Sequence, residues 1–185
     1  MGGADKCLLR VGQLSILERT VRTLSKQSEN IYLNVNGDAS RFAQSGLEIF
    51  ADFDKSLGGP LYGISTALSY LRERHTDAAY ILTVAGDCPF LPEDLLPRLL
   101  NAAQSGTYEV AIAQSLTRNH YVIGLWATSI KTKLDEFIAN KQHSVGRFIR
   151  TLKNTQVAFE VDQIDPFFNI NTADDYQQAQ QLDKL

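Results

Sequence analysis

The chain has 185 residues, of which 44% are hydrophobic and 21% are charged, and its formal net charge is −3. This length is sufficient for one domain with a sizeable core, so we expect a single domain over residues 1–185. The nearly balanced charge excludes a bulk attraction to nucleic acid or to an anionic membrane, so a phosphate ligand would have to be held locally. Two cysteines and the lack of a long apolar run favour a reducing, cytoplasmic location.

Hydrophobic periodicity predicts helices that alternate with strands along the chain. In chain order we expect a helix capped by Ser15, strands at 31–33 and 47–50, a helix from Pro60, a strand at 79–84, a helix from Pro92, strands at 110–112 and 121–126, helices at 130–138 and 145–152, a strand at 157–161 and a helix at 173–182. The segment at 79–84 is apolar almost without a break, which is typical of a strand buried on both faces of a parallel sheet. The alternation therefore favours a three-layer α/β/α sandwich with a mostly parallel sheet.

Ligands of such sheets gather at the carboxyl ends of the strands. Asn34 and Asn36 directly follow the strand at 31–33, and their amides can donate and accept as recognition of a base or ribose requires. An ordinary turn with amide caps explains them equally well. Asp52 follows the next strand, where it is either a ligand contact or a simple cap.

A glycine-rich segment, Leu57-Gly58-Gly59-Pro60-Leu61-Tyr62-Gly63, comes shortly after Asp52. Glycines let a backbone approach a flat ligand, and a helix that begins at Pro60 offers free N–H groups at its start. The start of a helix would by itself account for the same residues, because proline is common at the first helical position.

Asp87 lies just beyond the strand at 79–84, in the segment Gly86-Asp87-Cys88-Pro89-Phe90-Leu91-Pro92. A carboxylate at the end of a buried strand is costly unless it is paired or binds a metal. Magnesium takes few protein carboxylates together with phosphate oxygens of a substrate, which suits a lone aspartate. The alternative is an aspartate that caps a helix. Cys88 is expected to be a small buried side chain rather than a nucleophile.

Two further sets of polar residues carry weaker signals. Asn169 and Asn171 precede the last helix, which Asn171 or Thr172 could also cap. The histidines, at positions 75, 120 and 143, show no metal-ligand spacing, and no Ser-His-Asp or Cys-His arrangement is indicated. Solvated or supporting histidines are therefore expected.

The first six residues, Met1-Gly2-Gly3-Ala4-Asp5-Lys6, resemble the second half of a nucleotide-binding loop. Gly2 and Gly3 would let the backbone turn tightly around phosphates, and Lys6 would supply a mobile positive charge for their oxygens. An ordinary glycine turn is the alternative. Such a loop normally follows a buried strand, so we expect the sheet of residues 1–185 to lack its first strand.

Together these loops resemble the molybdenum cofactor guanylyltransferase family over nearly the whole chain. The family's opening signature is approximately Leu-Ala-Gly-Gly-x-x-x-Arg-Met-Gly-Gly-x-Asp-Lys, and residues 1–6 are similar to its second half. The other matches are residues 34–37 with the guanine-nucleotide loop, Asp52 with a nucleotide-contacting aspartate, residues 59–63 with a Gly-Pro-Leu-x-Gly motif, Asp87 with the magnesium-binding aspartate, and residues 165–172 with the C-terminal Phe-x-Asn-x-Asn-Thr segment.

This resemblance implies a Rossmann-like nucleotidyltransferase fold and a Mg²⁺-dependent transfer of GMP from GTP to the molybdopterin form of the molybdenum cofactor, with release of pyrophosphate. It implies nucleotide contacts at Gly2, Gly3, Lys6, Asn34, Asp52, Gly59, Pro60, Leu61 and Asp87, catalytic roles for Lys6 and Asp87, a metal ligand at Asp87, and pterin contacts at Asn169 and Asn171. GTP and molybdopterin are the implied partners, and molybdoenzyme apoproteins or their chaperones are further candidates.

Two functional alternatives stay open at this point. The chain could be a related nucleotidyltransferase with another base or acceptor, such as a cytidylyl or sugar-phosphate enzyme. It could instead bind the cofactor without catalysis. The absent half of the signature, which includes an arginine, is explained either by a start upstream of Met1 or by a shortened and impaired protein.

Overall fold

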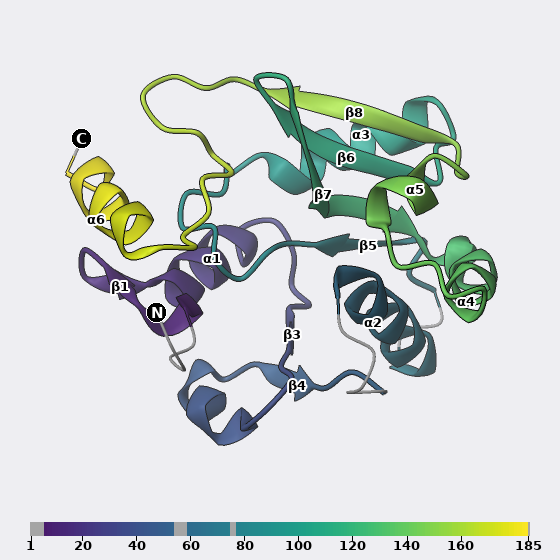
Figure 1. Ribbon diagram of the computed structural model, residues 1–185, viewed down its shortest axis with the longest axis horizontal. Coiled ribbons are helices and arrows are strands. Elements are labelled where there is room, and N and C mark those ends of the chain that lie inside the picture. Colours follow the sequence, from purple (N-terminus) through teal and green to yellow (C-terminus); the bar gives the residue numbers. More distant parts are fainter. Residues whose placement is uncertain (1–5, 54–58, 75–76, 185) are drawn as a thin grey trace.

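The computed structural model describes residues 6–53, 59–74 and 77–184 (Figure 1). Its strands are β1 (Arg10–Val11), β2 (Leu14–Ser15), β3 (Tyr32–Asn34), β4 (Glu48–Phe50), β5 (Tyr80–Thr83), β6 (Val110–Ser115), β7 (Arg118–Ala127) and β8 (Asn154–Phe159). Its α-helices are α1 (Ile16–Leu24), α2 (Pro60–Arg74), α3 (Leu95–Ser105), α4 (Lys131–Ala139), α5 (Val145–Ile149) and α6 (Ala173–Leu182), with short 3₁₀ helices η1 (Lys6–Leu8), η2 (Ala39–Ser45) and η3 (Thr128–Ile130).

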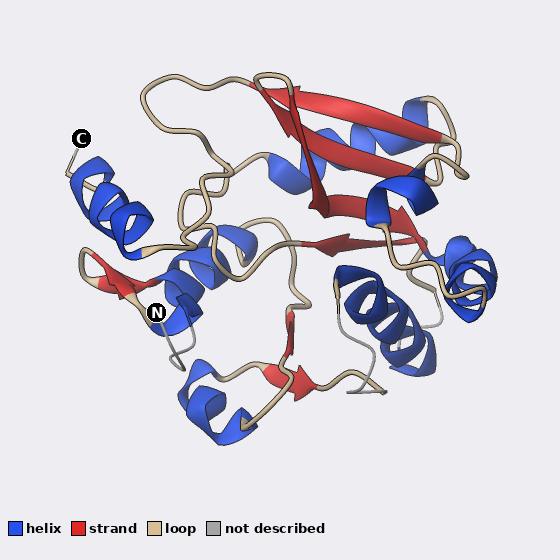
Figure 2. Cartoon of the chain, in the orientation of Figure 1, coloured by secondary structure: helices blue, strands red, loops and turns tan. Residues whose placement is uncertain are grey.

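The largest sheet has the strand order β5-β7-β6-β8 and is mixed (Figure 2). β7 runs antiparallel to both β5 and β6, whereas β8 runs parallel to β6. The expectation of a mostly parallel sheet is therefore wrong for these strands. The reason is local: only Leu116 and Thr117 connect β6 to β7, and so short a connection forces neighbouring strands to be antiparallel.

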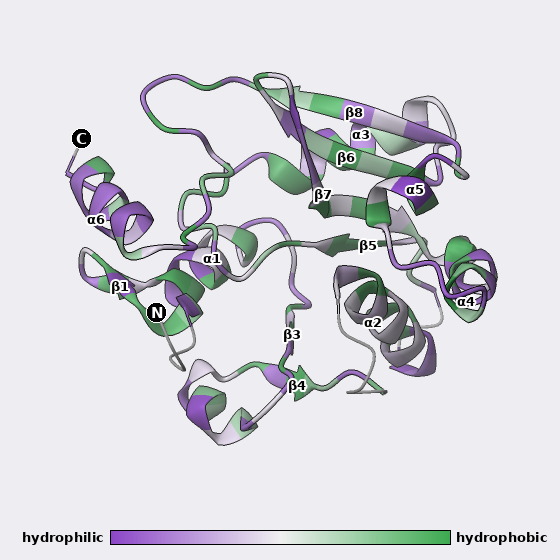
Figure 3. Ribbon diagram, viewed as in Figure 1, coloured by the Kyte–Doolittle hydropathy of each residue, from purple (hydrophilic) through white to green (hydrophobic). Residues whose placement is uncertain are grey.

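The expected layered packing is confirmed on both faces of this sheet. From β6, Val110 and Ile112 pack in one cluster with side chains of α2, α4 and α5, whereas Ala111 and Ala113 pack against α3. This alternation follows from the two-residue period of a strand. In Figure 3 much of β6 is green, as expected for a buried strand, whereas much of α6 is purple.

A second parallel pair, β3 with β4, lies apart from the four-stranded sheet in the structure. Beside it, α1 and the β1–β2 hairpin contribute to two smaller apolar clusters. The C-terminal helix α6 packs on the hairpin, and the hydroxyl of Tyr176 donates to the carbonyl of Arg10 at 2.7 Å. The two ends of the described chain therefore meet at the β1–β2 hairpin.

Local capping signals are confirmed with one exception. Ser15 caps α1 in a capping box with Glu18, and Thr172 caps α6 in the same way with Asp175. The helix expected from Pro92 begins at Leu95 instead, because a turn in which the Leu95 N–H donates to the Pro92 carbonyl occupies the preceding residues. The remaining expected elements lie within a few residues of their predicted positions. No helix in the described ranges is long and apolar enough to span a bilayer.

Candidate active site

A hydrogen-bonded polar cluster joins the loops after β3 and β4. The amides of Asn34 and Asn36 donate to the two carboxylate oxygens of Asp52 at 2.8 and 2.6 Å, and the Asp52 N–H donates to the Asn36 side chain at 3.0 Å. Parallel pairing of β3 with β4 places Asn34 opposite Phe50, so both loops start at the same edge. Asn34 and Asp52 are thus brought together as the sequence predicts, and Asn36 joins them.

The cluster combines one buried carboxylate with two exposed amide side chains. Asp52 is only 7% exposed, and its carboxylate is satisfied by the two amides, which removes most of the cost of its burial. The side chains of Asn34 and Asn36 are exposed. Their outward-facing polar atoms can therefore contact a ligand while Asp52 holds both amides in place.

The start of α2 borders the same cluster. Gly59 has φ +116°, a conformation that favours glycine, and Pro60 is the first helical residue, as expected. A Cβ atom added to Gly63 would lie 4.0 Å from the Asp52 carboxylate, so the first turn of α2 faces Asp52 closely. The side chain of Leu61 is in the core at 1% exposure, so any ligand contact there would come from its main chain.

The loop that carries Asp87 is fixed by the C-terminal segment. The Ile170 N–H donates to the Asp87 carbonyl at 3.0 Å, which leaves the half-buried carboxylate outside this backbone contact. Asp87 does not cap α3, since that helix begins at Leu95. Cys88 is 2% exposed, and burial raises the pKa of its thiol, as does the neighbouring Asp87 carboxylate. The prediction that Cys88 is a small buried side chain is confirmed.

A lone carboxylate at this position fits a magnesium ion that is shared with substrate. Within the described ranges, no group of three or more His, Cys, Asp or Glu side chains could hold a metal ion by itself. Magnesium is commonly held by one or two carboxylates together with phosphate oxygens. Asp87 is therefore suited to an ion that arrives with a nucleotide.

Lys6 and Asn171 meet although 165 positions separate them in the chain. The Lys6 ammonium donates to the Asn171 side-chain oxygen at 2.9 Å. The Asp175 carboxylate accepts the N–H groups of Asn171 and Thr172, and these bonds lower the pKa of Asp175. The phosphate-side and pterin-side residues of the sequence analysis are thus neighbours. Asn169 is half-buried in the same segment.

Part of the predicted loop cannot be placed. Gly2 and Gly3, expected to wrap phosphates, lie outside the described residues, and so does His75. The expectation of a supporting role holds for His143, whose Nδ1 lies 3.0 Å from the Tyr62 hydroxyl.

Contrary to the sequence analysis, a serine, a histidine and an aspartate do come together. Ser115 donates to the Asp165 carboxylate at 3.0 Å and lies 2.7 Å from Nε2 of His120. Partial burial lowers the pKa of His120, and the carboxylate of Asp165 opposes that shift. Ser115 is 1% exposed and occupies the middle of the network, so this is not the geometry of an activated nucleophile.

The network instead supports the C-terminal segment. The second carboxylate oxygen of Asp165 accepts the Phe167 N–H at 2.9 Å, and the His120 ring packs on Phe167 with 4.7 Å between ring centroids. Ser115 and His120 flank the β6–β7 turn, so their closeness follows from the hairpin. Asp165 is joined to them only by the tertiary fold, which is why no local pattern indicates this cluster.

Comparisons with known proteins identify the family to which the chain is similar. The family model described as the MobA-like NTP transferase domain matches residues 1–157. Molybdenum cofactor guanylyltransferases from Nitrobacter hamburgensis and Mesorhizobium japonicum are 36% and 39% identical to the chain, over 100% and 98% of it and 89% of each relative.

Solved structures share the fold at lower identity. The molybdopterin-guanine dinucleotide biosynthesis protein A of Archaeoglobus fulgidus is 19% identical and superposes with a TM-score of 0.73, over 97% of this chain and 91% of its own. The 2-C-methyl-D-erythritol 4-phosphate cytidylyltransferase of Thermus thermophilus is 15% identical with a TM-score of 0.70, over 97% and 94%. The fold is therefore that of a Rossmann-like nucleotidyltransferase. With both the family model and full-length relatives in agreement, the chain belongs to the MobA-like nucleotidyltransferase family, among the molybdenum cofactor guanylyltransferases.

Proposed function

We propose that this protein transfers GMP from GTP to the molybdopterin form of the molybdenum cofactor and releases pyrophosphate. The observation that carries the proposal is the placement of Asn34, Asp52 and Asp87, which match the family's motifs. Asn34 ends β3, Asp52 comes after β4 and Asp87 comes after β5, so each lies at or beyond the carboxyl end of a strand, where α/β enzymes bind their ligands. Relatives that bear this activity in their names cover nearly the whole chain.

The Asn34–Asp52 cluster is proposed to hold the guanine nucleoside. Amides can read the edge of a base or ribose hydroxyls because they donate and accept in one plane. Two amides locked on one buried carboxylate are pre-oriented, so little side-chain freedom is lost when a ligand binds. Gly59 and Pro60 would let the nucleotide approach the first turn of α2.

Lys6 and Asp87 are proposed to act on the phosphates. A pterin phosphate oxygen would form a bond to the α-phosphorus of GTP as the bond to the β-phosphate bridging oxygen breaks, and the electron pair would leave with pyrophosphate. Asp87 would hold Mg²⁺, which, when bound, neutralises charge on the phosphate oxygens. Lys6 would steady the same oxygens. The attacking phosphate is already ionised at neutral pH, so no general base is required.

The segment with Asn169 and Asn171 is proposed to face the pterin. Asn171 also binds Lys6, so the acceptor side and the nucleotide side are linked by one hydrogen bond. Correct seating of this segment on Asp87 would bring the two substrates into line, which is the main catalytic requirement of phosphoryl transfer.

A related activity with another nucleotide is the second candidate, because a cytidylyltransferase shares the fold. A nucleotide panel separates the two: purified protein is incubated with molybdopterin, magnesium and each of GTP, CTP, ATP and UTP, and pyrophosphate release is measured. We expect release with GTP and little with the others. Equal or faster release with CTP would refute guanylyl specificity, and pterin binding without any turnover would favour a binding protein.

The role of Lys6 is tested by Lys6→Ala. A charge-assisted contact to phosphate is worth about 1.5–3 kcal/mol, so GTP affinity should fall roughly tenfold to a hundredfold in calorimetry. Asn171→Ala removes the Lys6 partner but keeps the charge, and should reduce pterin binding more than GTP binding. Lys133→Ala, at an exposed ion pair with Glu109, is the control. Unchanged GTP affinity in Lys6→Ala would show that Lys6 is only a surface residue.

A further inference from the structure

The β6–β7 hairpin carries a chain of hydrogen bonds that ends on the carboxylate of Asp165. Ser115, which is 1% exposed, donates its only hydroxyl proton to one Asp165 oxygen at 3.0 Å. Nε2 of His120 lies 2.7 Å from the same hydroxyl oxygen. Because the hydroxyl proton is already used, Nε2 must carry a hydrogen and donate it to Ser115. The chain therefore runs from His120 through Ser115 to Asp165.

His120 is the first donor of this chain, and its surroundings favour the neutral ring. Partial burial lowers the pKa of His120, the Asp165 carboxylate opposes that shift, and the charge of Arg118 adds to it. The neutral imidazole is therefore favoured, with its hydrogen on Nε2 rather than on Nδ1. The same ring packs on Phe167, with 4.7 Å between the ring centroids. One side chain of the hairpin thus supplies both a hydrogen-bond donor and a ring contact.

The pairing of β6 with β7 is irregular beside His120. The register shifts between Ile112 and Gln114 of β6, which is where β7 reaches His120. Two residues further along β7, the Val122 carbonyl accepts the Thr83 hydroxyl at 2.7 Å, so the irregular stretch is itself held by a hydrogen bond. Bulges of this kind re-aim side chains and are frequent next to active sites. The regular pairing of the sheet is thus interrupted at the residue that begins the chain.

Asp165 begins the segment that the proposed function places beside the pterin. Its second carboxylate oxygen accepts the Phe167 N–H at 2.9 Å, and its carbonyl accepts the Phe168 N–H at 3.0 Å. The Phe167 side chain is 2% exposed and so anchors this turn in the core. Asn169 and Asn171 follow directly. The position of Asp165 therefore determines where the two asparagines begin their path along the site.

The same segment lies along the loop that carries Asp87. The Ile170 N–H donates to the Asp87 carbonyl at 3.0 Å, and the Cys88 thiol lies 3.8 Å from the Phe167 carbonyl oxygen. These contacts join the main chains of the two segments. The distance between the acceptor-side asparagines and the Asp87 carboxylate therefore depends on how Phe167 is seated, and that in turn depends on Asp165.

We propose that His120, Ser115 and Asp165 are positioning residues that set the affinity for the acceptor substrate and take no part in nucleotide binding. These roles rest on the proposed function, in which Asn169 and Asn171 face the pterin. A pre-oriented segment loses little freedom when the acceptor binds, whereas a loose segment must first be ordered, at a cost in affinity. Once the acceptor is bound the same complex forms, so the cost affects the KM for molybdopterin and not kcat.

Two substitutions separate the hydrogen-bond donor of His120 from its ring. His120→Phe keeps a ring on Phe167 but removes the N–H, whereas His120→Gln keeps an N–H near the position of Nε2 but removes the ring. His120→Phe should raise the KM for molybdopterin about tenfold, as expected when a hydrogen bond in a chain to a carboxylate is lost. His120→Gln should keep the original KM. The KM for GTP and kcat should be unchanged in both variants.

Ser115→Ala breaks the same chain in its middle and should raise the KM for molybdopterin in the same way. Asn119→Ala is the matched control, because it removes a hydrogen bond of 2.9 Å to Gln114 in the same hairpin and leaves the chain to Asp165 intact. It should change neither KM. Equal rises of both KM values in His120→Phe, or a fall in Tm with both KM values unchanged, would show a purely structural role and overturn the proposal.

Measurements on the protein without nucleotide keep this test separate from that of the proposed function. Nitrogen chemical shifts should show His120 with its hydrogen on Nε2, and the Phe167 amide should exchange faster in His120→Phe but not in His120→Gln. A hydrogen on Nδ1 alone would overturn the proposal. Calorimetry with molybdopterin and no nucleotide should show the same loss of affinity in His120→Phe, so the acceptor role is decided even if the original protein transfers no GMP.

Discussion

Asp87→Asn is expected to reduce the rate of guanylyl transfer about a hundredfold or more, with the fold unchanged. Loss of the charge that holds a magnesium ion at the phosphates removes several kcal/mol of transition-state stabilisation, and each 1.36 kcal/mol is a factor of ten in rate. The side chain keeps its shape, and the main-chain contact with Ile170 is unaffected by the substitution. The measurement is pyrophosphate release at saturating GTP and molybdopterin, across a magnesium titration.

Asp94→Asn is the matched control, because Asp94 is an exposed residue of the same loop region that pairs with Arg98. It should retain near-normal activity, since surface ion pairs contribute about 0–1 kcal/mol. Circular dichroism and Tm should be unchanged in both variants. Half of the original activity in Asp87→Asn at saturating magnesium would show that Asp87 is not the metal ligand.

Asp52→Ala is expected to weaken GTP binding strongly and to destabilise the fold. The substitution removes the acceptor for both Asn34 and Asn36 at a position that is 7% exposed. Hydrogen bonds to a charged group contribute about 1.5–3 kcal/mol, so a clear fall in Tm should accompany the loss of affinity. The two effects share one cause, which is the release of the amides from fixed positions.

The two effects can be separated by Asp52→Asn and by a surface control. Asp52→Asn keeps the volume but presents an N–H group to one of the two amides, so GTP affinity should fall with a smaller loss of Tm. Asp162→Ala removes an exposed carboxylate and should change neither quantity. If calorimetry showed an unchanged GTP affinity for Asp52→Ala, the cluster would serve only to hold together the loops after β3 and β4.

Features that depend on residues close together in the chain can be predicted from the sequence. The cap at Ser15, the start of α2 at Pro60 and the burial of Cys88 are examples, because each depends on a few adjacent residues or on local hydrophobicity. For the last helix the sequence leaves Asn171 and Thr172 as candidate caps, and the structure shows Thr172 in that role. The motifs after the strands also located Asn34 and Asp52 at one sheet edge. Such motifs are short and contiguous, so a single sequence is enough to find them.

Strand direction was decided by a turn whose residues gave no signal. Leu116 has φ +51°, in the left-handed region that leucine rarely adopts, and neither it nor Thr117 is a typical turn residue. Turn propensity therefore could not indicate the β6–β7 hairpin. β7 lies between β5 and β6 and runs antiparallel to both, which follows from that short connection and from the packing of helices on both faces of the sheet.

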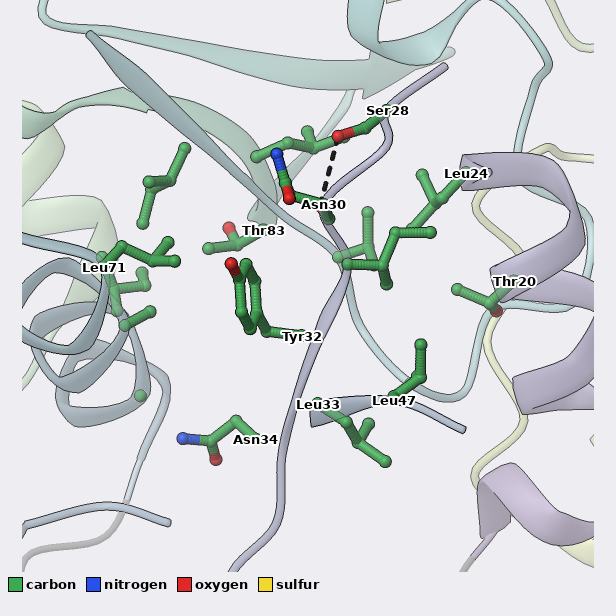
Figure 4. A pocket seen from close by; sticks show the side chains of 18 of the residues that line it. Thr20, Leu24, Ser28, Asn30, Tyr32, Leu33, Asn34, Leu47, Leu71 and Thr83 are labelled. Atoms are coloured by element: carbon green, nitrogen blue, oxygen red, sulfur yellow. Dashed lines mark hydrogen bonds between the residues drawn. The ribbon is translucent and has the colours of Figure 1, made fainter. Parts of the chain in front are cut away.

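Contacts between segments that are distant in the chain become visible only in the folded protein. The bond between Lys6 and Asn171, and the network that joins Asp165 to Ser115 and His120, link positions whose closeness no periodic pattern encodes. The same holds for a pocket lined by residues of β3, β5, α2 and α3, elements that lie far apart in the chain (Figure 4). Periodicity specifies which face of an element is apolar, but the choice of its partner is made when the complete core packs together.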